Sequence, residues 1–270
     1  MVTHTIDGAD GVSLAVEETG SGRPVVLIHG YSQSRLSWRN QFESNLTEDF
    51  RLIAPDNRGH GESDKPHDAY ADSDLWARDL DAVFAELDVD DAVLVGWSYG
   101  GLAVLDYLDA FGTDRVAGLN LVGGVSEIGT EAGNARLGQA YLDLMEGFVS
   151  TDVMESVRTL QEFVDLCVYD DLSSADRAYM LGYNVVVPPR VRDSLRDRTV
   201  RHDSSLAALD IPVLVTHGEE DAVMLPKSAR EYEDLADDAT LSMYPETGHT
   251  PFWESPDRYN RELRQFARDL

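Results

Sequence analysis

The sequence predicts an α/β fold in which helices cover both faces of a mostly parallel central sheet, and three observations support this prediction. Short, continuous apolar runs recur along the chain, as in strands that are buried on both faces. Apolar residues at the 3.6-residue spacing of an amphipathic helix separate several of these runs. The alternation is interrupted once, by a long stretch with helical patterns only. The alternation predicts βαβ units, and the interruption predicts a helical insertion.

The first half of the chain contains most of the expected strands. Val12, Leu14 and Val16 alternate with polar or small residues, as in a strand with one buried face. The continuous apolar runs that follow are residues 25–28, 52–54, 92–95 and 116–122. Helical patterns are found at residues 75–87 and 102–111.

The insertion is expected between residues 126 and 206. Its helical segments are residues 140–148, 153–168 and 175–187. Two prolines, Pro188 and Pro189, are expected to stop the last segment. Strand patterns return at residues 212–216 and 241–244, and a final helix is expected at residues 258–270. The predicted organisation is a core of residues 1–125 and 207–270 with a helical cap of residues 126–206.

The charge of the chain is strongly negative. Among 270 residues, 50 acidic side chains face 22 basic ones, which gives a formal net charge of −28. Such a surface repels nucleic acid and anionic lipid, so neither is an expected partner. The acids are spread over the whole chain and only Lys65 and Lys227 are lysines, a pattern that resembles proteins of salt-accumulating halophiles. We therefore expect self-repulsion to destabilise the fold at low ionic strength, and salt to relieve it.

Other features exclude several classes of protein. Cys167 is the single cysteine, which rules out an internal disulfide and a cysteine-rich zinc site. No His, Cys or Asp spacing predicts a metal site, and we expect no cofactor. The first residues lack the charged and apolar regions of a secretory signal. No apolar run approaches the roughly 20 residues of a membrane-spanning helix. We expect a soluble, cytoplasmic protein.

The strongest functional signal is the segment Gly-Trp-Ser-Tyr-Gly-Gly at residues 96–101. It matches G-x-S-x-G, and it stands between an expected strand and an expected helix, as a nucleophile elbow requires. A sharp turn at this point holds the serine in strained backbone geometry. The N-terminus of the helix behind it favours developing negative charge. We therefore predict that Ser98 is a catalytic nucleophile.

A serine hydroxyl needs a base to take its proton. On this type of fold the base is expected last in the chain, after an acid that orients it. Asp221 follows the expected strand at residues 212–216, at the carboxyl edge where such sheets place their sites. His249 follows the last expected strand and a glycine, and it precedes the final helix. The predicted triad is Ser98, Asp221 and His249.

The site also needs donors for the tetrahedral oxygen and a pocket for the substrate. The backbone N–H of Tyr99, directly after the nucleophile, and that of Tyr31, after the strand at residues 25–28, are the expected oxyanion-hole donors. For the pocket, we expect four apolar side chains to be available beside the nucleophile or in the cap: Trp97, Tyr141, Met145 and Phe148. Packing within the core or between cap helices is the competing interpretation of each.

Taken together, the motifs form a recognisable set. In chain order they are His-Gly-Tyr at 29–31, Asp-Asn-Arg-Gly-His-Gly-Glu-Ser at 56–63, the elbow at 96–101, His-Gly-Glu-Glu-Asp at 217–221 and Gly-His at 248–249. This set resembles the α/β-hydrolase superfamily, and within it the esterase and cofactor-free haloperoxidase (perhydrolase) branch. The resemblance implies the α/β-hydrolase fold and a helical cap after the sixth strand. It supports the same triad and oxyanion-hole positions.

The resemblance leaves one alternative position for the acid of the triad, and the residue at the elbow argues against two activities of the family. Some family members place the acid after the sixth strand, where Glu127 stands here; the loop around Asp221 fits the usual pattern better. Haloalkane dehalogenases and epoxide hydrolases of this fold carry aspartate at the elbow, and Ser98 argues against both.

The predicted function is that of a serine hydrolase of the carboxylesterase class, acting on a small-molecule ester through an acyl-enzyme on Ser98. Two alternatives use the same triad: perhydrolysis, seen as haloperoxidase activity without a cofactor, and hydrolysis of a carbon–carbon bond. A ligand-binding receptor that keeps the fold is a third. The expected partner is a small-molecule substrate, and the chain is expected to be a monomer or a homodimer.

Overall fold

The computed structural model describes residues 1–270 and contains one eight-stranded sheet. Its strand order is β1-β2-β4-β3-β5-β6-β9-β10. The strands are β1 (Val2–Asp7), β2 (Ser13–Gly20), β3 (Arg23–Ile28), β4 (Phe50–Pro55), β5 (Ala92–Trp97), β6 (Val116–Val122), β9 (Val213–Gly218) and β10 (Ala239–Tyr244). β2 is antiparallel to β1 and β4, and the pairs from β4 to β10 are parallel. The predicted fold class is confirmed.

Burial explains which strands the sequence pattern could indicate. All six residues of β5 are buried, so its sequence is a continuous apolar run. β1 lies at the edge of the sheet, and only Ile6 among its six residues is buried. A strand with so little buried surface has no strong apolar pattern, and β1 was not predicted.

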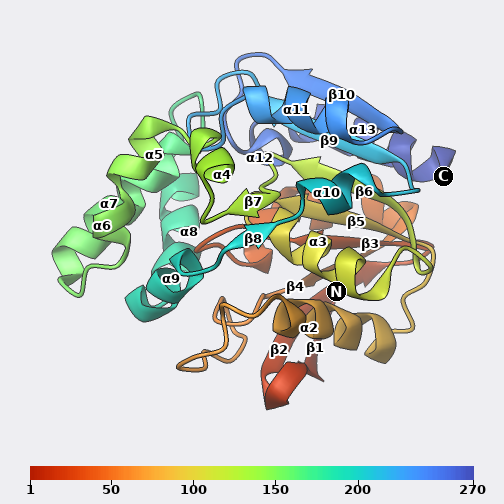
Figure 1. Ribbon diagram of the computed structural model, residues 1–270, viewed down its shortest axis with the longest axis horizontal. Coiled ribbons are helices and arrows are strands. Elements are labelled where there is room, and N and C mark those ends of the chain that lie inside the picture. The colour runs from red at the N-terminus through yellow and green to blue at the C-terminus, as the bar shows by residue number, and fades with distance from the viewer.

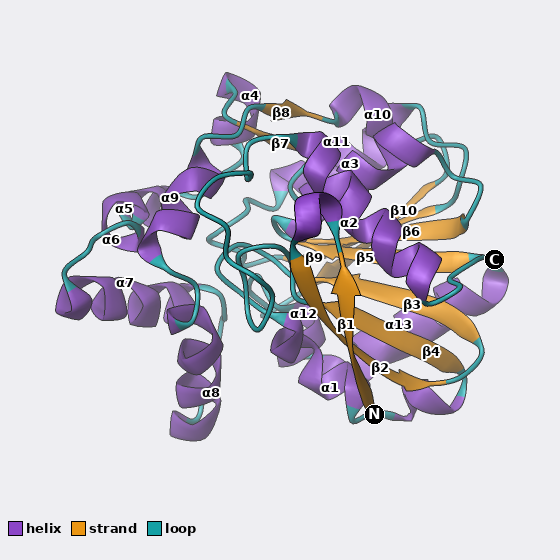
Figure 2. Ribbon diagram, turned by 90° about the horizontal axis from the view of Figure 1, so that it is seen from below, coloured by secondary structure: helices purple, strands orange, loops and turns teal.

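Helices cover both faces of the sheet (Figures 1 and 2). On one face lie α2 (Ser73–Glu86), α3 (Gly100–Phe111), α10 (Asp203–Ala207) and α11 (Lys227–Leu235). On the other lie α1 (Arg39–Phe42), α12 (Pro251–Glu254) and α13 (Pro256–Asp269). Three short 3-10 turns complete the core: η1 (Ala9–Gly11), η2 (Arg35–Trp38) and η3 (Asn45–Glu48). The polar helix α11 was not predicted, because it buries only Ser228, Ala229 and Tyr232.

Most of the chain between β6 and β9, up to α9, projects from one side of the sheet (Figure 1). It contains α4 (Glu131–Ala135), α5 (Gln139–Asp143), α6 (Met145–Phe148), α7 (Val153–Leu166), α8 (Ser174–Val185) and α9 (Pro189–Arg196). We call α4 to α9 the cap helices. A two-stranded antiparallel ribbon of β7 (Glu127–Ile128) and β8 (Val200–Arg201) joins the two ends of this segment.

The cap differs from the sequence prediction in two places. The single helix expected at residues 140–148 is divided into α5 and α6 at Leu144. Pro189 does not only follow a helix; it occupies the first turn of α9. Proline is tolerated there, since the first N–H groups of a helix have no internal partner and the fixed φ suits a helix.

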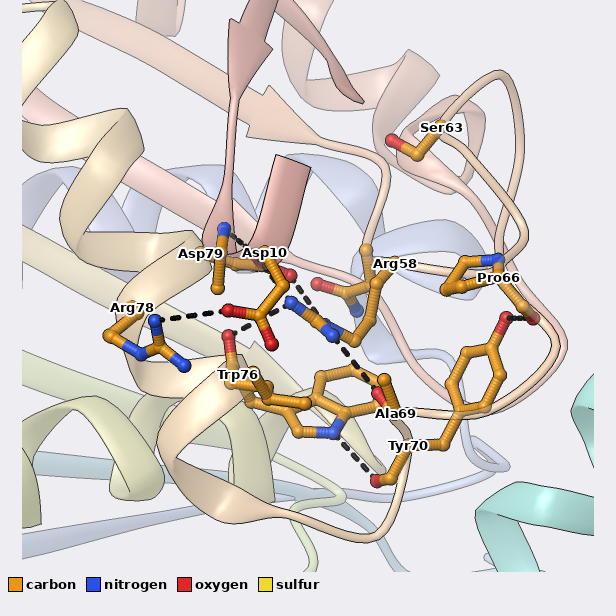
Figure 3. Close-up of polar contacts among 12 residues, drawn as sticks. Asp10, Arg58, Ser63, Pro66, Ala69, Tyr70, Trp76, Arg78 and Asp79 are labelled. Carbon is orange, nitrogen blue, oxygen red and sulfur yellow. Dashed lines mark hydrogen bonds and ion pairs between the residues drawn. The ribbon is translucent and has the colours of Figure 1, made fainter. Parts of the chain in front are cut away.

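The long loop after β4 is held by a buried arginine (Figure 3). Arg58 donates two hydrogen bonds to Asp79 of α2, at 2.7 and 2.8 Å, and a third to the carbonyl of Ala69. The indole of Trp76 donates to the carbonyl of Tyr70 at 2.9 Å. Arg58, which belongs to the motif at residues 56–63, therefore closes the loop onto α2.

The chain ends lie away from the cap helices, and the C-terminal end of α13 lies at the opposite side of the molecule (Figures 1 and 2). None of the helices combines the length and apolar character that crossing a membrane requires.

Candidate active site

Ser98 lies in the turn between β5 and α3, in a backbone conformation that L-residues rarely adopt. Its φ is +53°. Its N–H donates to the carbonyl of Val122 at 3.0 Å, which fixes the turn to the end of β6. A Cβ added to Gly30 would come within 2.9 Å of the Ser98 Cβ. The loop after β3 therefore passes directly against the serine, and only glycine leaves room for this approach.

His249 and Asp221 form a buried hydrogen-bonded pair. The His249 Nδ1 and the Asp221 Oδ2 are 2.7 Å apart. The Asp221 Oδ1 accepts from the backbone N–H groups of Val223 and Met224, at 2.8 and 2.9 Å. The carboxylate is thus fixed by its own loop, and it fixes the imidazole tautomer in which Nδ1 carries the proton.

A second imidazole contacts the same carboxylate. The His217 Nε2 lies 3.2 Å from the Asp221 Oδ2 and 2.7 Å from the carbonyl of Met224. Burial opposes ionisation of Asp221, but His249 and His217 together hold the pKa of this carboxyl below its ordinary value. Asp221 is therefore a stable anion at neutral pH, and it can stabilise an imidazolium at His249.

Gly123 connects the serine side of the site with the histidine side. It follows Val122, the acceptor of the Ser98 N–H, and its φ is +48°. A Cβ at this position would be 2.9 Å from the His249 Nδ1 and 3.3 Å from Asp221. The other ring nitrogen of His249, Nε2, is buried without a hydrogen-bond partner. It is therefore free to accept a proton.

The backbone N–H groups of Tyr31 and Tyr99 donate no hydrogen bond within the chain. Both residues line the same cavity as Ser98. Their hydroxyls are held by the segment that contains α9, because Tyr31 donates to the carbonyl of Arg192 at 3.0 Å and Tyr99 to that of Leu195 at 3.4 Å. Two free N–H donors beside a serine can hold a developing oxyanion.

A buried ion pair fixes Tyr99 further. Arg198 follows the cap helices and donates to Asp106 of α3 at 2.6 Å, and both side chains are fully buried. A second nitrogen of Arg198 lies 3.3 Å from the Tyr99 hydroxyl. His202 contacts the other oxygen of Asp106 at 2.8 Å. This cluster joins the end of the cap segment to the helix behind the nucleophile.

A cavity of about 350 Å³ opens beside Ser98, between the carboxyl edge of the sheet and the cap helices. Of its 17 lining residues, 11 are hydrophobic, which suits an apolar acyl or alcohol group. Tyr141 and Met145 line it, as the sequence interpretation allowed. The sequence did not indicate the contributions of Glu127, Arg196 and Met224.

Trp97 and Phe148 do not line this cavity, which corrects their assignment as pocket residues. Trp97 points to the other face of the sheet, where its ring packs edge-on against Phe252. Phe148 is fully buried behind the cavity wall, between Tyr31 and Phe163. Alternation along β5 places neighbouring residues on opposite sides, so adjacency to Ser98 in sequence does not bring Trp97 to the pocket.

Glu127, the alternative acid, contacts a different partner. Its Oε2 accepts from the Thr130 hydroxyl at 2.9 Å, and its side chain lines the cavity. Among the acids, Asp221 is the one hydrogen-bonded to His249. No group of three or more His, Cys, Asp or Glu side chains is arranged to hold a metal ion.

The sheet order, the serine at the turn after β5 and the histidine–aspartate pair at the same edge are features of one class of enzymes. The family model of the alpha/beta hydrolase fold matches residues 23–256, and the chain belongs to this family. Its homologues include esterases, non-heme haloperoxidases and carbon–carbon bond hydrolases.

Three comparisons illustrate this range. The solved structure of the esterase RhEst1 from Rhodococcus sp. ECU1013 is 40% identical, with a TM-score of 0.93 and complete coverage of both chains. A putative non-heme chloroperoxidase of Synechocystis is 28% identical over 98% of each chain. A 2-hydroxy-6-oxo-2,4-heptadienoate hydrolase of Pseudomonas putida is 25% identical over 89% of this chain and 87% of its own.

Proposed function

We propose that the protein is a serine hydrolase that cleaves small-molecule carboxylic esters through an acyl-enzyme on Ser98. The observation that carries the proposal is the 2.7 Å hydrogen bond between Asp221 and His249. The imidazole Nε2 is buried without a hydrogen-bond partner. Gly123, which follows the acceptor of the Ser98 N–H, lies against the Nδ1 of the same ring. The similarity to the esterase RhEst1 over the whole chain supports the ester class.

In the proposed mechanism, His249 takes the proton of Ser98 as Oγ attacks the ester carbonyl. The N–H groups of Tyr31 and Tyr99 stabilise the tetrahedral oxyanion, and Asp221 stabilises the imidazolium. His249 then protonates the leaving alcohol, and the carbonyl carbon stays bound to Ser98. Water, deprotonated by His249, hydrolyses this acyl-enzyme and releases the carboxylic acid.

The cavity limits the substrate. A volume of about 350 Å³ with a mostly apolar lining accommodates a short or medium acyl chain. Glu127 and Arg196 are the charged side chains of the lining. The resemblance to a haloperoxidase and to a carbon–carbon bond hydrolase makes perhydrolysis and carbon–carbon cleavage the competing activities of the same groups.

The test is hydrolysis of p-nitrophenyl esters from acetate to octanoate, in molar salt, with Ser98→Ala and the control Ser228→Ala. Ser228 is also a buried serine, but it lies on α11 and donates to the carbonyl of Leu225. We expect Ser98→Ala to lower kcat/KM by about 10⁴-fold or more, and the control to match the wild type. Equal activity of all three proteins would refute the proposal. The folded wild type could also hydrolyse no ester, but halogenate with acetate and peroxide or cleave a vinylogous diketone. That result would replace the proposed activity with the competing activity that is observed.

A further inference from the structure

The loop that carries His249 is hydrogen-bonded to the cap. We call residues 245–250 the His249 loop and residues 167–169 the cap turn, which follows α7. The N–H of His249 donates to the carbonyl of Cys167 at 2.9 Å, and the Thr250 hydroxyl lies 3.3 Å from the same oxygen. A Cβ on Gly248 would be 2.9–3.0 Å from the backbone of the cap turn, so the two segments lie in direct contact.

One carboxylate joins these two segments. Glu254, at the end of α12, accepts from the N–H of Gly248 at 3.0 Å and from the Thr250 hydroxyl at 3.0 Å. It also accepts from the N–H of Tyr169 in the cap turn at 2.7 Å. The side chain is half-buried, and burial raises its pKa although these donors favour the anion. Hydrogen bonds to a carboxylate are stronger than those between neutral groups. The end of α12, the His249 loop and the cap turn are therefore fixed to one another.

The core holds the same loop from the opposite side. The indole N–H of Trp97, the residue before the nucleophile, donates to the carbonyl of His249 at 3.0 Å. The backbone of His249 is therefore bonded at its carbonyl to the nucleophile strand and at its N–H to the cap turn. Asp221 orients the imidazole ring, but the position of the main chain that carries the ring depends on the position of the cap turn.

We propose that Glu254 is a positioning residue whose carboxylate clamps the His249 loop to the cap turn, so that placement of the imidazole depends on the cap. The proposal rests on the proposed function for its kinetic consequence. A displacement of a reacting group by about 1 Å can cost about 10²-fold in rate. Loss of the clamp should therefore lower kcat. KM should change little, because other residues line the cavity proposed to bind the substrate.

Glu262 provides a matched control. It is also a half-buried glutamate near the C-terminus, and its carboxylate accepts from the hydroxyls of Ser242 and Tyr244, both at 2.7 Å. It pairs with Arg258 and touches neither the His249 loop nor the cap turn. Glu262→Ala and Glu262→Gln change the same atoms as Glu254→Ala and Glu254→Gln, so they report the general effect of losing a half-buried carboxylate.

The first arm of the experiment is steady-state ester hydrolysis. We expect Glu254→Ala to lower kcat by about 10–100-fold with KM within about twofold of the wild type. The kcat of Glu254→Gln should lie between that of Glu254→Ala and that of the wild type. Glu262→Ala and Glu262→Gln should keep the wild-type kcat. The proposal is overturned if folded Glu254→Ala turns over within about twofold of the wild type, or if Glu262→Ala loses as much activity. If Glu254→Ala does not fold, the same criteria apply to Glu254→Gln.

The second arm is hydrogen exchange followed by mass spectrometry, which does not depend on activity. Glu254→Ala should increase deuterium uptake in peptides covering the His249 loop and in peptides covering the cap turn. Glu262→Ala should increase it in neither. Unchanged uptake in the cap turn would overturn the clamp even if kcat falls. If Ser98→Ala remains active, the proposed triad fails, and this arm still decides whether the clamp exists.

Discussion

The core and the cap helices differ in two respects: where the histidines of the chain lie, and whether large apolar side chains are exposed. Five of the seven histidines of the chain are buried, and all of them lie in the sheet, its edge loops or the segment after the cap helices: His29, His60, His202, His217 and His249. Residues 131–196, which form the cap helices, contain no histidine. The cap region instead exposes large apolar side chains, among them Val153 at 72% and Met154 at 69%.

This difference separates two tasks. The core holds the residues of the proposed triad, and hydrogen bonds fix Asp221 and His249 in a buried environment where charge interactions are strong. The cap provides apolar walls for the cavity and, through the cap turn, hydrogen bonds to the His249 loop and to Glu254. Changes in the core should therefore alter the rate of the reaction or its dependence on acid, and changes of cap residues that line the cavity should alter the choice of substrate.

The largest expected effect comes from Asp221, the acid of the proposed triad. Asp221→Asn should lower kcat by about 10⁴-fold, because the amide favours the wrong imidazole tautomer and cannot stabilise the imidazolium. Glu127→Gln, which changes a carboxylate of the cavity lining, should stay within about tenfold of the wild type toward neutral p-nitrophenyl esters. An inactive Glu127→Gln together with an active Asp221→Asn would assign the acid of the triad to Glu127 instead of Asp221.

Acid sensitivity should also be a property of the core. Burial lowers the pKa of His29 to about 4 and that of His60 to about 3, whereas an unfolded histidine titrates near 6.5. Below pH 6.5 the unfolded chain therefore binds protons that the folded chain does not, and stability falls until the folded pKa is reached. Each histidine should lower the free energy of unfolding by about 2 kcal/mol between pH 7 and pH 5.

This expectation can be measured by denaturant unfolding of His60→Asn at pH 7 and pH 5 in constant salt. Protonating surface carboxylates relieves self-repulsion, so the variant is compared with the wild type at each pH. The pH dependence should shrink by about 2 kcal/mol in His60→Asn. In His67→Asn, which changes an exposed histidine, it should not. An unchanged pH dependence in His60→Asn would show that His60 does not account for the acid sensitivity.

The smallest expected effect lies in the cap. Met145 lines the cavity, and Met145→Ala enlarges it. The ratio of kcat/KM for octanoate to that for acetate should rise by about tenfold, which is the usual scale for a few methylene contacts. Met154→Ala, at an exposed cap position, is the control and should leave the ratio unchanged. An equal shift in both variants would indicate a general loosening of the cap and not a change of the cavity.

The sequence predicts the parts of this site that local patterns determine. Buried strands such as β5 are continuous apolar runs, and a strained serine turn needs small neighbours, so the elbow and its flanking elements were predictable. Cavity walls are formed by tertiary packing, which a local pattern does not contain. Phe148 and Met145 are three residues apart in the cap, yet one is buried behind the wall and the other forms it. The Glu254 clamp joins residues 85 positions apart, at Tyr169 and Glu254, and has no local pattern at all.

The position of the chain ends has a practical consequence. Both termini lie away from the cap helices. A tag or a covalent tether at either end would therefore attach the protein to a resin at a distance from the cap helices that help to line the cavity. Neither attachment would involve the cap turn or the His249 loop, so an immobilised form should keep the turnover of the free protein.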